Sequence, residues 1–436
     1  MVDKKVIQSV IDNREYNKVI VKYYQRYLKE LEGRRKIYKD FSYLVDTLGF
    51  ALSNKDKDQV KILRPAVEGM FKNLDVSLEY LRLDEGYSIN FNNLGDVLKL
   101  QEKVKFVLSG LNDLKLNVIA NRIDALESCN KFWVLDKYEL QKIKDLKKQN
   151  LCHDKFCANC KKVKQSARMG KYIPELEKYK DQLYHLTLTV PNCSGKDLRS
   201  TIKKMNEARR HLMRFLNGTK RIKGIDLSSW GYLGAVCSLE ITFRGDSYHP
   251  HFHVGLVMDQ SVLSAKRYKN TYSYNYKNGI SELKRLFSKE ELLIQKIWRL
   301  LYDGVKVTEK NIKNLKEGYS CIIDQFHEDD YAELFKYMTK EKDEEGQILT
   351  YENFKALYEG LYRLKQIQGY GCLYRITDDI DVEEYEEAYN MIIEFIRKKE
   401  SPVEVLETPQ ELFLDTQYKI ISRKSYFKYL RSLYHG

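Results

Sequence analysis

Three histidines occupy alternate positions in the segment Tyr248–Val254, which reads Tyr-His-Pro-His-Phe-His-Val. Alternate side chains of a strand lie on one face of a sheet, so His251 and His253 are expected to point the same way. His249 continues that face as a further candidate ligand, although Pro250 can bend the strand there. Two imidazoles so arranged can bind one divalent ion. The alternative is a polar sheet face without metal, but a His-x-His-x-His pattern in a chain with only 8 histidines favours a metal site.

A carboxylate for this site lies on the preceding predicted strand. The strand-like stretches 233–243 and 248–258 flank a turn signal at 244–247, and together they predict a β-hairpin. Glu240 is a polar residue between apolar neighbours, and in such a hairpin it would lie across from the histidine face. A carboxylate with two imidazoles and open coordination positions suits Mg²⁺ or Mn²⁺ acting on phosphate oxygens.

A tyrosine, a glutamate and a lysine share one face of a predicted helix over 328–342. Glu333 and Tyr337 are four residues apart, and Lys340 follows after three more. A tyrosine oxygen can attack phosphorus and form a covalent intermediate. A carboxylate can act as general base, and a lysine can stabilise phosphate charge. Alone, the helix would be an ordinary surface helix with a Glu–Lys pair; beside the histidine hairpin it becomes a candidate catalytic element.

Four cysteines are clustered upstream of the hairpin. Cys152, Cys157 and Cys160 form a compact Cys-x4-Cys-x2-Cys knuckle, which Cys129 could complete as a four-cysteine site for structural Zn²⁺. His153 is an alternative ligand, and free thiols in a turn are the alternative without metal. The tight spacing favours zinc, because the other four cysteines are scattered. Basic residues follow the knuckle and could contact a DNA backbone: Lys161, Lys162, Lys164, Arg168 and Lys171.

Composition sets the broad class of the chain. With 436 residues, the expectation at ~150 residues per domain is two or three domains. Apolar residues make up 43% and proline only 6 residues, which indicates a globular protein. The excess of 75 Lys and Arg over 62 Asp and Glu, a net charge of +13, fits an anionic partner such as nucleic acid. The absence of an 18-residue apolar run and of an apolar leader predicts a cytoplasmic protein without a membrane partner, in which disulfides are not expected.

Periodicity divides the chain into four regions. Residues 1–115 are expected to form a helical N-terminal extension, whose third amphipathic segment runs from Leu94 to Leu116. We expect a zinc-knuckle region over 116–180 and, over 181–350, a domain that carries the histidine and tyrosine motifs. The rest, 351–436, is expected to be mainly helical with strand-like interruptions near 369–376. The other predicted elements are a strand at 184–190 and helices at 197–216 and 283–301.

These motifs, in this order, closely resemble the rolling-circle plasmid replication initiators (Rep proteins) of Gram-positive bacteria, members of the HUH endonuclease superfamily. The resemblance covers roughly 117–376 and includes a glycine-bearing segment at 369–371. It rests on the cysteine knuckle, the strand Leu186–Val190, the Glu240 strand, the histidine segment and the tyrosine helix.

The resemblance implies an α+β fold, in which a central antiparallel sheet with the histidine hairpin is flanked by helices. It also implies a reaction on single-stranded or hairpin origin DNA. A metal held by His251, His253 and Glu240 would polarise the scissile phosphate, and Tyr337 would become joined to the 5′ phosphate. The released 3′-OH would prime synthesis, and Glu333 would later activate water or assist a second cleavage.

Two regions depart from what the resemblance covers. The helical region 1–115 is an addition to what the short plasmid initiators contain. It is a candidate to bind origin duplex, a host helicase or another subunit in a homo-oligomer. The C-terminal residues are also uncovered, so the element could be a plasmid, a phage-like replicon or an integrated element. The host polymerase is a further expected partner.

Three alternative functions remain open at this point. The same HUH chemistry serves transposases and relaxases. A non-catalytic zinc-knuckle DNA-binding regulator would not depend on Tyr337. A metal-dependent phosphoesterase without a covalent step would cleave DNA and leave no protein attached.

Overall fold

The computed structural model describes residues 4–74, 89–129, 132–139, 142–149, 151–259, 263–270, 275–278, 281–335, 346, 348–374 and 418–422. The chain divides into two compact units. One unit is Arg14–Cys129, and the other combines Met1–Asn13 with Asn130–Gly436. The unit Arg14–Cys129 is helical over its described residues, and the other contains the sheets.

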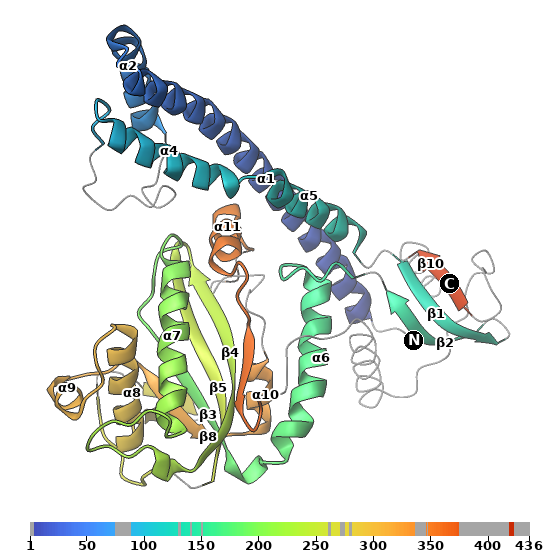
Figure 1. Cartoon of the computed structure of the whole chain (residues 1–436). Helices are drawn as coiled ribbons and strands as arrows, with labels where there is room; N and C mark the ends of the chain where they lie inside the picture. Colours follow the sequence, from blue (N-terminus) through green and yellow to red (C-terminus); the bar gives the residue numbers. More distant parts are fainter. Residues whose placement is uncertain are drawn as a thin grey trace. The chain divides into compact units, whose positions relative to one another are not determined.

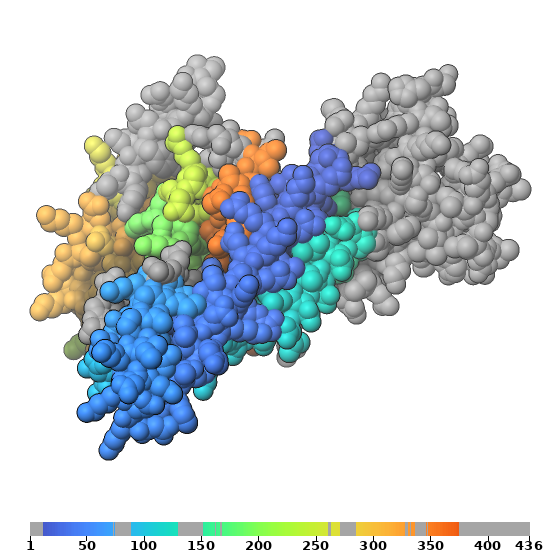
Figure 2. Space-filling model, turned by 90° about the horizontal axis from the view of Figure 1, so that it is seen from above, coloured from blue at the N-terminus to red at the C-terminus, as the bar shows by residue number. Residues whose placement is uncertain are grey.

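The helical unit is built around the long helix α1 (Lys4–Ser53), which supplies its residues from Arg14 onward. Its buried residues recur at spacings of three, four or seven, as an amphipathic helix requires: Ile20, Tyr24, Tyr27, Leu31, Tyr38, Phe41, Val45 and Leu48. Three further helices follow: α2 (Lys57–Asn73), α4 (Leu94–Ser109) and α5 (Asp113–Ser128). In Figure 2 the blue atoms of α1 lie against the teal atoms of α5, where Arg35 donates to Asp113.

The single amphipathic segment predicted over 94–116 is in fact two helices. Helix α4 ends at Ser109 and Gly110 is its C-cap, so the chain leaves the helix there. Asn112 then begins α5, because its side chain accepts a hydrogen bond from the backbone N–H of Lys115. The prediction of one continuous segment was therefore wrong. An apolar period alone does not show this break, which is marked by a glycine and a helix-capping asparagine.

A five-stranded antiparallel sheet forms the centre of the other unit, in the order β8-β3-β5-β4-β9. Its strands are β3 (Leu183–Thr189), β4 (Tyr232–Arg244), β5 (Ser247–Met258), β8 (Cys321–Gln325) and β9 (Ile367–Gly371). The predicted hairpin is present as β4 and β5. Gly245 has a φ of 55° at its turn, a left-handed conformation that glycine adopts without a Cβ clash.

The two faces of the sheet are covered by different helices, as Figure 1 shows for α7 and α8 on one side and α6 and α10 on the other. Phe252 of β5 lies under Arg209 of α7 and 6.4 Å from the ring of Trp298 of α8. The opposite face packs on α6 and the end of α10 through a cluster that includes Tyr172, Leu334 and Phe335. The histidines of β5 alternate with Phe252, so they lie on the α10 face.

The predicted helix over 197–216 is found with its start shifted by one residue, and the described part of the predicted helix over 328–342 is helical from Glu328 to Leu334. The helices of this unit are α6 (Ala158–Glu177), α7 (Leu198–Leu216), α8 (Lys289–Tyr302), α9 (Glu309–Asn314), α10 (Glu328–Leu334) and α11 (Tyr351–Gly360). The prediction of a helix from 283 was wrong, since β7 (Ser281–Lys284) occupies its start. Ser288 and Glu291 then form a capping box that fixes the first turn of α8.

Two smaller sheets were not foreseen in the sequence. One has the order β10-β1-β2 and joins β1 (Phe132–Glu139) and β2 (Lys142–Gln149) to the distant β10 (Tyr418–Ser422). The other pairs β6 (Asn275–Asn278) with β7. Among the helices that the structure describes, none combines the length and apolar character needed to cross a membrane.

Candidate active site

Glu240, His251 and His253 form a buried cluster on the α10 face of the central hairpin. Glu240 of β4 pairs directly with His251 of β5, and Ser238 pairs with His253, so the hairpin register brings the three side chains together. One carboxylate oxygen, Glu240 Oε2, lies 3.0 Å from His251 Nε2 and 3.0 Å from His253 Nε2. All three residues are at least nine-tenths buried. The predicted ligand geometry depends on this register, which the sequence could suggest but not fix.

The chemistry of this donor set fits a divalent cation. The three residues can each offer one ligand atom, and these atoms lie within 4.8 Å of one another. Burial lowers the pKa of His253, the neighbouring His251 and His185 act in the same direction, and Glu240 acts against them. A lowered pKa keeps the imidazole neutral at physiological pH and for some way below it. The neutral ring is the form that binds metal. A cation here would also compensate the buried carboxylate.

His249 lies outside this three-residue group. Its Nδ1 is 2.8 Å from Asn192 Oδ1, and its ring centroid is 5.3 Å from that of His251. Its backbone carbonyl is the acceptor 3.1 Å from His251 Nδ1. His249 thus hydrogen-bonds to the cluster through its backbone carbonyl, and its side-chain Nδ1 faces Asn192, three residues after the end of β3.

The structure adds two residues that sequence reasoning missed. His185 of β3 places its Nε2 3.1 Å from His253 Nδ1, and its Nδ1 lies 2.8 Å from Asp330 Oδ1 of α10. The sequence contains only a weak signal that His185 belongs to the site. It is a histidine at the start of a predicted strand, and the residues it contacts in the site lie far from it in the sequence. The contact depends on the pairing of β3 with β5 and on the docking of α10, which are both long-range features.

The predicted nucleophile segment is only partly within the described residues. Glu333 is half-buried in α10, one turn beyond Asp330, and Leu334 and Phe335 are buried against the sheet. Tyr337 and Lys340 lie outside the described residues, as does the rest of the predicted helix beyond Phe335. Helix α10 therefore runs from the histidine cluster to within a few residues of Tyr337 in the chain.

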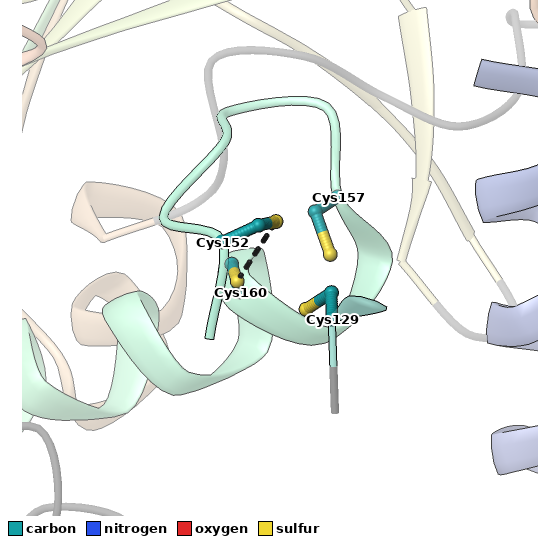
Figure 3. Close-up of side chains that lie close together, drawn as sticks. All are labelled: Cys129, Cys152, Cys157 and Cys160. Carbon is teal, nitrogen blue, oxygen red and sulfur yellow. Dashed lines mark hydrogen bonds between the residues drawn. The ribbon is translucent and has the colours of Figure 1, made fainter. Parts of the chain in front are cut away.

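The four predicted cysteine ligands lie together at the start of α6, where Figure 3 shows their side chains turned toward a common centre. Sulfur atoms of Cys129, Cys152, Cys157 and Cys160 lie within 4.8 Å of one another, and the sulfurs of Cys152 and Cys160 are 3.5 Å apart. A tetrahedral zinc–thiolate site with bonds of about 2.3 Å needs sulfurs about 3.8 Å apart, so the cluster fits zinc. His153, the alternative ligand, is not part of the group.

The knuckle is attached to the histidine hairpin through α11. Phe156 packs on Phe354 of α11, with ring centroids 4.9 Å apart. Asn353, in the same helix, donates to the Gly245 carbonyl at 2.7 Å and to the Tyr248 hydroxyl at 2.8 Å. The cysteine loop therefore supports the helix that holds the tip of the β4–β5 hairpin.

The sequence of this chain is similar to those of known replication proteins. The family model of a replication protein, Rep_1, matches residues 143–274, which include the knuckle and the whole β4–β5 hairpin but not Glu333 or Tyr337. A "Protein rep" from Staphylococcus aureus is 35% identical over 165 residues, covering 36% of this chain and 66% of the relative. A "Protein rep" from Streptococcus pneumoniae serotype 2 (strain D39 / NCTC 7466) is 27% identical over 236 residues, covering 51% and 61%.

A third relative extends the similarity over more of the chain. A "Protein rep" from Lentilactobacillus hilgardii is 25% identical over 342 residues, covering 76% of this chain and 87% of the relative. The chain spans a little under two thirds of the length of the first two relatives. No solved structure matches the chain. The family model and the three relatives together support a rolling-circle Rep family of replication proteins for this chain.

Proposed function

We propose that this protein initiates rolling-circle replication by nicking and rejoining one DNA strand through an HUH-type mechanism. The observation that carries the proposal is the convergence of Glu240, His251 and His253 on one point, beside the helix that leads to Tyr337. Paired imidazoles with a carboxylate suit a cation that binds phosphate oxygens. Tyr337, which follows that helix in the sequence, would then supply a nucleophile, which a simple metal-binding regulator would not need.

In the proposed cleavage, the Tyr337 oxygen attacks the scissile phosphorus of single-stranded DNA. The bond from phosphorus to the 3′ oxygen breaks, the tyrosine proton is lost to a base, and a free 3′-OH is released. The protein is left joined to the 5′ phosphate. Lys340 would stabilise the added negative charge of the transition state. Glu333, one turn before Tyr337 on the predicted helix, would later take a proton from water or from a 3′-OH that attacks the phosphotyrosine.

Glu240, His251 and His253 are the residues that would hold Mg²⁺ or Mn²⁺ in this reaction. When bound, such a cation supplies Lewis-acid polarisation of the phosphate oxygens. The chain's own contribution is to fix the three ligands on rigid paired strands and to keep their surroundings dry. At the knuckle, Cys129, Cys152, Cys157 and Cys160 would hold a structural Zn²⁺, since all four positions are taken by protein ligands.

The proposed DNA partner fits the charge of the unit that contains the sheet. Helix α7 and the loop after it carry a row of basic side chains: Lys203, Lys204, Arg210, Arg214, Lys220, Arg221 and Lys223. Such a row can contact phosphates without reading bases, and its contribution should weaken with salt. A host helicase and polymerase, and a second copy of this chain, complete the proposed set of partners.

The proposal is tested by replacing Glu240 with glutamine. Single-stranded DNA that covers the protein's own gene and flanks is incubated with Mn²⁺, and products are separated on denaturing gels. The variant should bind the cation poorly and so lose several kcal/mol of transition-state stabilisation. Cleavage should then be slower by roughly 10²–10³-fold. Glu317→Gln is the matched control, since Glu317 is an exposed carboxylate that precedes β8 and belongs neither to the histidine cluster nor to the basic row, and it should cleave at the wild-type rate. Equal rates for both variants would remove the cluster from the reaction.

The alternatives give different products in the same assay. Cleavage without attached protein would indicate a phosphoesterase, and DNA binding without cleavage across many sequences would indicate a regulator. A transposase or relaxase would form the same adduct. It would be recognised if a plasmid carrying the gene and its flanks failed to replicate in a Gram-positive host even though the purified protein nicks.

A further inference from the structure

The two imidazoles of the histidine cluster are oriented by different partners on their far nitrogens. His251 Nδ1 faces the backbone carbonyl of His249 at 3.1 Å. A carbonyl only accepts, so His251 Nδ1 must donate, and its Nε2 carries the lone pair that faces Glu240. His253 Nδ1 instead meets a second imidazole. Its partner there is His185 Nε2, at 3.1 Å.

Asp330 decides which way the hydrogen bond between His185 and His253 runs. The Asp330 carboxylate is an acceptor, so His185 Nδ1, 2.8 Å away, donates to it. A neutral His185 then has only a lone pair at Nε2 and must accept from His253 Nδ1. His253 Nε2 is left without a proton and faces Glu240 Oε2 as a metal ligand. The hydrogen-bonded series Asp330–His185–His253 therefore keeps the proton of His253 on Nδ1, as the His249 carbonyl keeps the proton of His251 on its Nδ1.

The fold makes room for this chain of contacts. His185 pairs across the sheet with Gly255, which has no side chain to occupy the α10 face. A Cβ at Gly255 would lie 3.3 Å from both Leu334 and Val236, which is tighter than ordinary packing. The His185 ring fills the neighbouring space, with its centroid 5.2 Å from that of His253, and is only 12% exposed.

We propose that His185 and Asp330 are positioning residues that hold His253 in the metal-binding tautomer and connect the metal cluster to the helix that precedes Tyr337. Asp330 serves both ends of this connection: its Oδ1 holds His185, and its Oδ2 accepts from the His327 backbone N–H at 2.7 Å, which caps α10. The inference rests on the proposed function for the identity of the ligands. Ligand orientation by partners behind a metal-binding histidine is a general requirement of metal sites.

The test compares two replacements of His185 by Mn²⁺ binding, measured calorimetrically on the full chain. His185→Ala removes the acceptor for His253 Nδ1 and should weaken Mn²⁺ binding by about 10–100-fold, the usual cost of losing such a partner. His185→Gln can place an amide oxygen near the position of Nε2 and should restore most of the affinity. His211→Ala is the control, since this histidine of α7 lies across the sheet from the cluster. Equal affinity for wild type and His185→Ala overturns the inference.

A second measurement uses the wild-type protein and so does not depend on whether His185→Ala folds. Nitrogen-15 labelling of the 8 histidines reports by NMR which ring nitrogen carries the proton in the Mg²⁺-loaded wild-type protein. We expect both His185 and His253 to be protonated at Nδ1. A proton on His253 Nε2 in the wild-type protein contradicts the proposal.

Failure of the proposed function is distinguishable from failure of this inference. If no DNA is cleaved but the alanine variant still loses Mn²⁺ affinity and the glutamine variant restores it, the positioning role stands and the nicking role falls. If DNA is cleaved through Tyr337 while both variants bind Mn²⁺ like wild type, the nicking role stands and the positioning role falls.

Discussion

Replacing Tyr337 with phenylalanine is expected to abolish the covalent protein–DNA product and to reduce cleavage below detection. Removing one hydroxyl removes the attacking atom, and water held at the same site would be a poorly positioned substitute. Loss of a covalent nucleophile in other hydrolytic systems costs about 10⁶-fold in rate, so no partial effect is expected. The measurement is a denaturing gel of labelled single-stranded DNA incubated with Mn²⁺ and each variant.

Tyr331→Phe is the matched control for this prediction. Tyr331 belongs to α10, but its hydroxyl donates to Glu177 of α6 at 2.7 Å, so its role is to fix the helix. This variant should fold slightly less stably, by about 1 kcal/mol for one lost hydrogen bond, and should still form the adduct. An adduct formed by Tyr337→Phe, or its loss only in Tyr331→Phe, would assign the nucleophile to another residue.

The second large effect is expected at the cysteine knuckle. Cys157 lies at the N-cap of α6 and is fully buried, so Cys157→Ser should remove a zinc ligand that no neighbouring side chain replaces. Structural zinc contributes about 10–16 kcal/mol to the folding of small zinc-dependent peptides. Losing even a third of that amount should lower the unfolding temperature by roughly 10–20 °C in a domain of this size.

The effect should extend beyond the knuckle because α11 joins it to the histidine hairpin. Phe156 packs on Phe354, and Asn353 holds the hairpin tip at Gly245. We therefore expect Cys157→Ser, and wild type treated with a strong chelator, to lose both zinc content and cleavage. Cys372→Ser is the control, since Cys372 is exposed and outside the cluster. Zinc content measured by mass spectrometry should be one equivalent in wild type and in this control; a zinc-free wild type with unchanged melting would refute the assignment.

The sequence predicted the central hairpin well because its signals are local. Two runs rich in apolar and β-branched residues on each side of a glycine turn indicate two paired strands, and the pairing places Glu240 opposite His251. The cysteine cluster was equally accessible, since three of its four ligands lie on one short loop. In both cases residue type and short spacing carry the chemistry.

Other features depend on contacts between distant segments, and local pattern does not contain them. The role of His185 depends on β3 pairing with β5 and on α10 docking against the same face. Strand β10 joins β1 although nearly three hundred residues separate them, a pairing that no local signal encodes. The false helix start at Leu283 has the opposite cause, since a short run of mixed residues fits a helix or a strand until the capping box at Ser288 is taken into account.

The most direct test of the central claim is to identify the atom that joins protein to DNA. Wild-type protein is incubated with Mn²⁺ and the cleaved single-stranded DNA, digested with protease and nuclease, and the nucleotide-bearing peptide is sequenced by mass spectrometry. The account predicts one modified residue, Tyr337, joined through its oxygen to a 5′ phosphate, together with a DNA product that ends in a 3′-OH. A nucleotide on any other residue, a linkage to a 3′ phosphate, or efficient cleavage with no modified peptide would contradict it.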